Sequence, residues 1–369
     1  MQTASLSTLT LYFVLMLVIG VYAWWRTAST AEGFLLAGRD LSPSVTALSA
    51  GASDMSGWLL LGLPGALYVT GLPAVWIAIG LVMGAWANWL LVAPRLRAQS
   101  EALGNSLTIP EFLANRFPES ALALRVVSAL IIVLFFAVYT ASGLVGGGKL
   151  FETAFVGLLP AGTGLTPYML GIAITAAVVL VYVALGGFLA VSLTDVVQGT
   201  IMFVALVAMP LMVLLGPGGD GGASIAAVPV PGFLSLTEGM SILGVISAVT
   251  WGLGYFGQPH IIVRFMAIRK VEDMPIARRI GMTWMVVCLL GAIGVGLAGR
   301  AYAERNGIAV DDPETIFIIL AGLLFHPLIT GFLFAALLAA IMSTVSSQLL
   351  VASSSLTEDF YRLFLRQRA

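Results

Sequence analysis

The chain has 369 residues, of which 59% are hydrophobic and only 9% are charged, and its mean hydropathy is +1.03. A soluble domain carries about 25% charged residues, so this composition excludes an ordinary water-soluble globular protein. The net charge of −1, without a basic stripe, excludes a nucleic-acid partner. With one cysteine, Cys288, and two histidines, the chain has no internal disulfide, and a cysteine- or histidine-based metal centre is not expected.

Runs of roughly 20 apolar residues recur along the chain, and each can cross ~30 Å of hydrocarbon as a helix. The N-terminal run has no Lys or Arg before it, so we interpret it as the first span and not as a cleaved signal peptide. We therefore predict a single all-α integral membrane domain over residues 1–369. The nine predicted spans are 9–25, 45–68, 74–93, 126–145, 168–186, 189–215, 240–257, 280–299 and 328–351.

The Lys and Arg residues predict how these spans are oriented. With the N-terminus outside, all of the 17 Lys and Arg residues except Lys149, Arg300 and Arg305 fall on the cytoplasmic side. Cytoplasmic loops carry an excess of these residues, so Ala369 is expected inside. Two further segments are expected outside: an irregular loop at 217–238 and a short half-helix at 316–325.

The predicted second span carries an acid near its middle. Asp54 lies about ten residues into the span, roughly 15 Å from its end, where a charge costs about 2.5–3.5 kcal/mol. Two glycines lie beside it, and each weakens a helix by about 1 kcal/mol. An interrupted helix would free carbonyl groups for a hard cation and N–H groups for a carboxylate. The alternative is a polar contact that joins two helices.

Polar residues near the other early spans each allow two interpretations. Arg39, in the first cytoplasmic loop, contributes to a gate or only to the orientation. Tyr139 and Ser142, in the fourth span, line a central cavity or simply pack against a neighbour. Asp195, at the start of the sixth span and close to the cytoplasmic face, is a gating or ion-route residue or an interfacial acid.

The predicted seventh span is interrupted at 251–259 by three glycines and a proline. Trp251 and Tyr255, four residues apart, share one face of a helix, and aromatic rings beside an irregular backbone suit a small, partly apolar ligand. Close helix contact through glycine is the alternative. Interrupted spans at matching positions of two repeats indicate a transporter binding site, and the second and seventh spans are five apart.

The predicted ninth span places Ala340 one turn before Ser343 and Thr344. The two hydroxyls and the carbonyl of Ala340 could offer neutral oxygen ligands to Na⁺. Alternatively, the hydroxyls bond to carbonyls of their own helix or join two helices.

Four segments carry a resemblance to a known family, namely 47–58, 185–192, 251–260 and 340–344. With them the chain resembles the sodium/solute symporter family, and within it the bacterial sodium/proline symporters, over essentially its whole length. The resemblance implies a leucine-transporter-type inverted-repeat bundle, with spans two to six (about 45–215) as the first repeat and spans seven to nine (about 240–351) starting the second. It also implies about four more spans beyond Ala369, without which we expect no transport.

The resemblance further implies which residues hold the ligands. The expected Na⁺ ligands are the carbonyls of Ala52, Met55 and Ala340 and the hydroxyls of Ser343 and Thr344, with Asp54 assisting. The residues expected around L-proline are Ser56, Gly57, Trp58, Tyr139, Trp251, Tyr255 and Pro259. The implied location is the bacterial inner (cytoplasmic) membrane, where the bilayer surrounds the chain and no protein partner is implied. The residue patterns alone do not select proline.

The leading interpretation is a secondary active transporter in which Na⁺ and substrate raise each other's affinity. A symporter of another small organic solute, or a channel or sensor of the same fold, is the alternative; a sensor would need a cytoplasmic signalling domain, and none precedes Ala369. An intramembrane enzyme would need a second acid at the depth of Asp54 or a histidine cluster. Asp195 is expected too near the interface to be that second acid. His260 and His326 are expected at span ends, so they form no cluster at that depth, and no enzyme is predicted.

Overall fold

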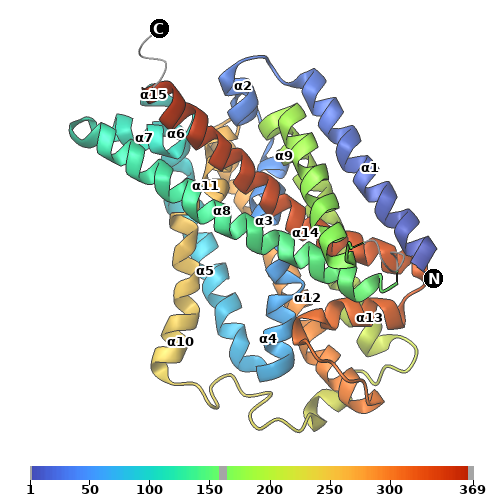
Figure 1. Ribbon diagram of the computed structural model, residues 1–369. Coiled ribbons are helices and arrows are strands. Elements are labelled where there is room, and N and C mark those ends of the chain that lie inside the picture. Colours follow the sequence, from blue (N-terminus) through green and yellow to red (C-terminus); the bar gives the residue numbers. More distant parts are fainter. Residues whose placement is uncertain (1, 158–163, 365–369) are drawn as a thin grey trace.

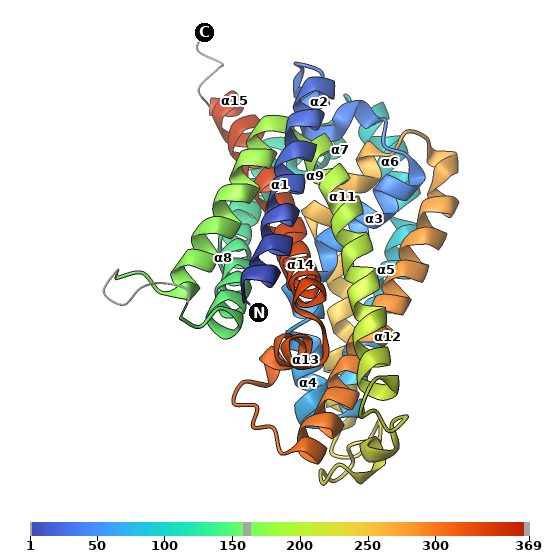
Figure 2. The same cartoon turned by 90° about the vertical axis from the view of Figure 1, so that its right-hand side faces the viewer.

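The computed structural model describes residues 2–157 and 164–364, so Ala369, like Arg366 and Arg368, lies outside the described residues. Long helices pack side by side, and shorter helices and loops gather at the two ends of the bundle (Figures 1 and 2). Within the described chain, β-pairing is limited to one isolated bridge between Leu41 and Ile268. The helical stretches long and apolar enough to cross a membrane are Thr3–Arg26, Leu72–Ala102, Pro118–Ala154, Pro167–Leu215, Val271–Asn306 and Pro327–Tyr361. The chain is therefore a multi-pass membrane protein.

The predicted second span is interrupted where its small residues and glycines lie. Helix α1 (Gln2–Arg26) and the short α2 (Ala31–Leu36) precede it. Helix α3 (Pro43–Met55) begins with Ser42 as its N-cap and ends at Ser56, whose φ of 48° no α-helix accepts. A 3₁₀ turn then leads to α4 (Gly62–Thr70). The interruption expected next to Asp54 is therefore present.

The third and fourth predicted spans correspond to single long helices. Helix α5 (Val75–Leu91) continues into α6 (Ala93–Ala102), and α7 (Ile109–Arg116) lies across the end of the bundle before α8 (Ala121–Ala154) (Figure 1). With 34 residues, α8 is about 50 Å long and exceeds the thickness of a bilayer core. Several of its large apolar side chains are exposed, among them Leu134, Phe135 and Val138.

Helix α9 (Pro167–Leu215) contains both the fifth and the sixth predicted spans. Its 49 residues would measure about 73 Å if straight, but the chain turns back at Gly187, where φ is 54° and ψ is −141°. A Cβ atom at this position would lie 2.5 Å from the carbonyl oxygen of Phe34. Glycine is therefore required here, and the two arms run in opposite directions (Figure 2).

The predicted seventh span is also interrupted, and it extends further than predicted. Helix α10 (Ile242–Val249) passes into a 3₁₀ segment, Thr250–Phe256, and the chain continues as α11 (Pro259–Ala267) and then α12 (Met274–Asn306). The prediction ended this span at 257 and assigned the following residues to a cytoplasmic loop. That boundary is wrong, because Pro259 takes the first turn of a new helix, where its missing N–H costs nothing.

Helix α14 (Pro327–Ser354) forms the centre of the bundle. It follows the short α13 (Ile316–Leu324), which matches the predicted half-helix, and it packs against α1, α3, α8 and α9. In the most apolar 18-residue stretch of the span Pro327–Tyr361, 83% is buried, a larger share than in any other candidate span of the described chain. Most of its polar side chains are therefore in the protein interior, where they need partners. A π-helical segment, Ser355–Tyr361, and α15 (Arg362–Phe364) follow.

Candidate functional site

The two interrupted segments meet against α14. A Cβ atom on Gly57, in the first interruption, would lie 2.8 Å from Cγ1 of Ile341 in α14. The indole rings of Trp58 and Trp251, one from each interruption, have centroids 5.9 Å apart. Segments nearly 200 residues apart in the chain thus form one wall.

This wall borders a cavity of about 430 Å³. The lining comes from both interruptions and from α8 and α14. Of the residues predicted to hold substrate or ion, those that line this cavity are Ser56, Gly57, Trp58, Tyr139, Trp251 and Thr344. Ser142 also lines it, so Tyr139 and Ser142 face the cavity and do not merely fill space between helices.

Tyr255 and Pro259 were predicted beside the same substrate, but they line other spaces. Tyr255 lines a cavity of about 20 Å³ together with Asp54, and Pro259 lines one of about 10 Å³ with Leu35 and Phe188. The expectation that Trp251 and Tyr255 share a face assumed an α-helix. The 3₁₀ segment has 3.0 residues per turn, and so Trp251 is 55% exposed whereas Tyr255 is 5% exposed.

The predicted Na⁺ ligands of α3 and α14 come together. Ser343 Oγ donates to the carbonyl oxygen of Ala52 at 2.8 Å and lies 3.1 Å from that of Ala340. Thr344 Oγ1 donates to the carbonyl oxygen of Ser53 at 2.8 Å. The last four carbonyls of a helix have no intrahelical partner, and in α3 these belong to residues 52–55, which include Met55. The end of α3 thus offers several oxygen atoms to α14.

Asp54 was expected to assist this group of oxygens. Its carboxylate accepts a hydrogen bond from the Tyr255 hydroxyl, and it lines the small cavity together with Gly51 and Trp89. Its hydrogen bond therefore joins the two interrupted segments to each other.

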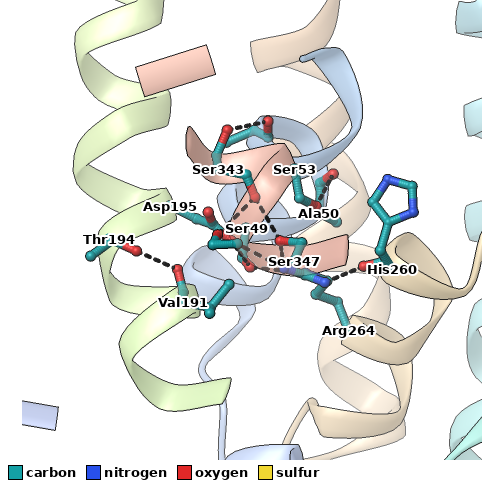
Figure 3. Close-up of polar contacts among 12 residues, drawn as sticks. Ser49, Ala50, Ser53, Val191, Thr194, Asp195, His260, Arg264, Ser343 and Ser347 are labelled. Carbon is teal, nitrogen blue, oxygen red and sulfur yellow. Dashed lines mark hydrogen bonds and ion pairs between the residues drawn. The ribbon is translucent and has the colours of Figure 1, made fainter. Parts of the chain in front are cut away.

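Asp195 was expected near the cytoplasmic face, either as a gating or ion-route residue or as an interfacial acid. Its side chain is fully buried and forms an ion pair of 3.3 Å with Arg264. Ser49 Oγ donates to Asp195 Oδ2 at 2.6 Å and accepts from Arg264 Nε at 3.1 Å. Figure 3 shows this cluster, to which α14 contributes Ser347 as a further acceptor for Arg264. The carboxylate of Asp195 is thus enclosed by side chains of the bundle.

The buried pair is linked to the predicted Na⁺ ligands. Ser347 Oγ donates to the carbonyl oxygen of Ser343 at 2.7 Å, one turn from the Ser343 hydroxyl that contacts Ala52. Arg264 is predicted from the sequence in a cytoplasmic loop, but its side chain is buried and only 1% exposed. Recognising that the seventh span resumes at Pro259 would have placed this arginine inside the bundle, where it requires an acidic partner.

His260 was expected at a span end, yet its side chain is fully buried. Its ring packs edge-on against Phe136 and Tyr139 of α8, with centroid distances of 5.1 and 6.3 Å. His260 therefore packs against Tyr139, which lines the main cavity.

Arg39 is buried at the other end of the bundle, although it was predicted in a loop. It donates to the carbonyl oxygens of Met266 and Ser106, both at 2.8 Å, and to Asn105 Oδ1 at 2.9 Å. Burial and the neighbouring Arg97 lower the pKa of Arg39 from its ordinary value. The guanidinium joins the end of α11 to the loop after α6.

Three comparisons with known proteins agree with one another. A family model of the sodium:solute symporter family matches residues 34–369. The osmoregulated proline transporter OpuE of Bacillus subtilis is 53% identical over 371 aligned residues, which cover 100% of this chain and 73% of that protein. A sodium/proline symporter of Staphylococcus aureus is 51% identical over 352 residues, covering 95% of this chain and 67% of that protein.

The third comparison concerns solved structures. A structure described as the substrate-bound, outward-open state of a Na⁺-coupled sialic acid symporter with a novel Na⁺ site aligns with a TM-score of 0.80. The alignment covers 98% of this chain and 75% of the other, at 17% sequence identity. At that identity the likeness establishes a shared fold.

Proposed function

This chain belongs to the sodium:solute symporter family, and we propose that it couples the downhill movement of Na⁺ to the uptake of L-proline. Its family and relatives are transporters, so it is not an enzyme. The observation that carries the proposal is the meeting of two interrupted helices at one cavity. Half-helices that face a central site are the usual architecture for binding an ion and a small solute within a membrane.

We infer nine spans in an inverted-repeat arrangement of the leucine-transporter type. Support comes from α9, whose two arms count as two spans, and from the interrupted pairs α3–α4 and α10–α11, which count as one span each. The first repeat would comprise residues at about 45–215. Spans seven to nine, at about 240–351, would form the start of the second repeat. The distribution of Lys and Arg favours an N-terminus outside and a C-terminal end of the chain inside.

Na⁺ would bind between α3 and α14. The carbonyls of Ala52, Met55 and Ala340 and the hydroxyls of Ser343 and Thr344 are neutral oxygen donors, which suit a hard monovalent cation. The two hydroxyls donate to carbonyls of α3, and on binding Na⁺ their lone pairs would turn toward the ion. Because the donors come from two helices, Na⁺ would hold the interrupted end of α3 against α14.

L-proline would occupy the inner end of the cavity. Ser56, Gly57 and Tyr139 offer polar atoms there, and the rings of Trp58 and Trp251 offer an apolar surface for the pyrrolidine ring. The first interruption supplies groups to both sites, since Ala52 and Met55 precede it and Ser56 to Trp58 form it. Ion binding that orders this segment would raise substrate affinity, and the effect must be reciprocal.

The test is uptake of labelled L-proline into proteoliposomes that contain a C-terminally extended form of the protein, with the further spans that the family resemblance implies. We expect accumulation under an inward Na⁺ gradient and loss of accumulation when the gradient is collapsed or replaced by K⁺. Trp251→Ala should weaken uptake, because it removes one of the two rings. Uptake that proceeds equally without a Na⁺ gradient would refute the proposed coupling.

A further inference from the structure

The main cavity has an outer end that the proposed substrate site does not use. Lys149 of α8 lines this end, together with Glu314 of a 3₁₀ segment, Pro313–Thr315. Tyr139, Gly146 and Lys149 follow one face of α8 toward the outer end. Tyr139 and Lys149 are separated by about 15 Å of helix, and Asp312 and Glu314 hold the ammonium group of Lys149 at the outer end.

The volume of the cavity is sufficient for more than one small solute. At ~30 Å³ per water molecule, the volume of about 430 Å³ corresponds to roughly 14 water molecules. A single proline at the inner end would leave the outer end open to solvent and to a second ligand.

The charges of the cavity are concentrated at the outer end. Among the described residues that line it, Lys149 and Glu314 alone carry a formal charge, whereas the inner end offers hydroxyls, backbone and indole rings. A free amino acid is a zwitterion that presents both charges as it leaves water. The outer end is therefore where this cavity can recognise both of them.

Among the described residues Lys149 donates to two carboxylates, which leaves one of its three N–H donors for a ligand. Its Nζ is 3.0 Å from Asp312 Oδ2 and 2.6 Å from Glu314 Oε2, and an ammonium group has three N–H donors. Asp312 Oδ1 also accepts from the backbone N–H of Glu314 at 3.0 Å, so Asp312 anchors the 3₁₀ segment. Burial alone would raise the pKa of Asp312, but the hydrogen bonds from Lys149 and Glu314 hold it below its ordinary value. The cluster thus carries one surplus negative charge.

We propose that Lys149 and Glu314 form an outer recognition site for the zwitterionic amino-acid substrate. The substrate carboxylate binds the free donor of Lys149, and the substrate amine binds Glu314, before the molecule moves to the inner end. This proposal rests on the proposed function, because the outer site would lie on the path of the same substrate into the same cavity. The outer site collects substrate and leaves the affinity of the inner site unchanged.

Stopped-flow measurement of intrinsic tryptophan fluorescence tests the proposal, since Trp58 and Trp251 line the proposed proline site. L-proline is mixed with the protein at saturating Na⁺, and the association and dissociation rate constants are compared for wild type, Lys149→Met and Lys149→Arg. A site that collects charged ligands raises association rates at least about tenfold. We expect Lys149→Met to slow association and dissociation by about tenfold each and to leave Kd unchanged, whereas Lys149→Arg keeps the wild-type rates.

Lys270→Met is the matched control, because Lys270 is exposed beyond the end of α11 and does not line this cavity. Faster association and dissociation in Lys149→Met would show that the cluster is only a barrier across the opening, and would overturn the proposal. A weaker Kd with an unchanged association rate would overturn it too, because the damage would then lie at the inner site. A wild-type protein without Na⁺-dependent proline binding would instead refute the proposed function.

Discussion

At the scale of single residues, Asp195 and Arg264 form an ion pair that is buried in the interior of the bundle. Removing one partner of a buried ion pair costs about 3–5 kcal/mol, because the other charge stays buried without compensation. Here the pair also holds Ser49 of α3 and Ser347 of α14, so four helices meet at two charges. Ser347 then donates to the Ser343 carbonyl, which places the pair one helical turn from the proposed Na⁺ site. A change at either site is therefore expected to alter the other.

The first prediction at this scale concerns the Na⁺ ligands. Ser343→Ala or Thr344→Ala should raise the Na⁺ concentration needed for half-maximal proline binding by about tenfold, since one oxygen ligand contributes about 1–1.5 kcal/mol. Binding of labelled proline to the purified protein over a range of Na⁺ concentrations measures the shift. Ser354→Ala is the matched control, because that hydroxyl lies on the same helix and, among the described residues, donates to the carbonyl of Val351 and not to α3. An unchanged Na⁺ dependence in both variants would remove these hydroxyls from the site.

At the scale of elements, glycine decides where helices can turn and how closely they approach. Helix α9 reverses its direction at Gly187, and this brings Asp195 to the centre of the bundle. Gly84 of α5 is so close to Gly252 of the 3₁₀ segment that a Cβ atom would lie 2.0 Å from the Gly252 carbonyl oxygen. The interrupted seventh span is thus held against α5 by backbone contact, and it is expected to move with α5.

Gly187→Ala should therefore destabilise the protein substantially. The backbone conformation at this position is close to one that only glycine adopts, which costs about 1–3 kcal/mol for other residues, and the new Cβ would also collide with Phe34. Gly307→Ala is the control, since its φ is also positive, at 62°, but its Cβ would meet nothing within 4 Å. Thermal unfolding in detergent should show a larger loss of Tm for Gly187→Ala. Equal losses would mean that the contact with Phe34 contributes nothing.

At the scale of the whole molecule, the two ends of the bundle differ in charge and in closure. The cavity carries Lys149 and Glu314 at one end, whereas Arg39 ties α11 to the loop after α6 at the other. This asymmetry suits a protein that exposes its site to one side of the membrane at a time. The excess of Lys and Arg on the proposed cytoplasmic side supports the proposed orientation.

Cysteine labelling tests that orientation. Asn306→Cys lies on the proposed outer side and Lys270→Cys on the proposed inner side, and both positions are exposed. In intact cells a membrane-impermeant maleimide should label position 306, and position 270 should react only after the membrane is permeabilised. The native Cys288 is buried and provides a low background. The reverse pattern would invert the proposed orientation.

Local signals in the sequence were sufficient for the class of protein and for the two interruptions. Apolar runs of span length, and clusters of glycine and proline beside Ser56 and Pro259, act on the backbone within a few residues, so they can be read without the fold. The motif beside Asp54 was also sufficient to indicate the family, which the comparisons confirmed. The residues proposed around Na⁺ and proline stay predictions, although several of them share one cavity.

The tertiary structure alone decided which side chains face each other. Asp195 and Arg264 are 69 positions apart, and no local pattern relates them, because their pairing depends on the reversal of α9 and on the continuation of the seventh span as α11. The separation of Trp251 from Tyr255 likewise depends on a 3₁₀ backbone that α-helical spacing does not anticipate. The sequence places Lys149 only on the outer side, and its proposed role depends on its contact with Glu314. Contacts between distant segments are properties of the folded chain, and so is the pitch of an irregular helical segment.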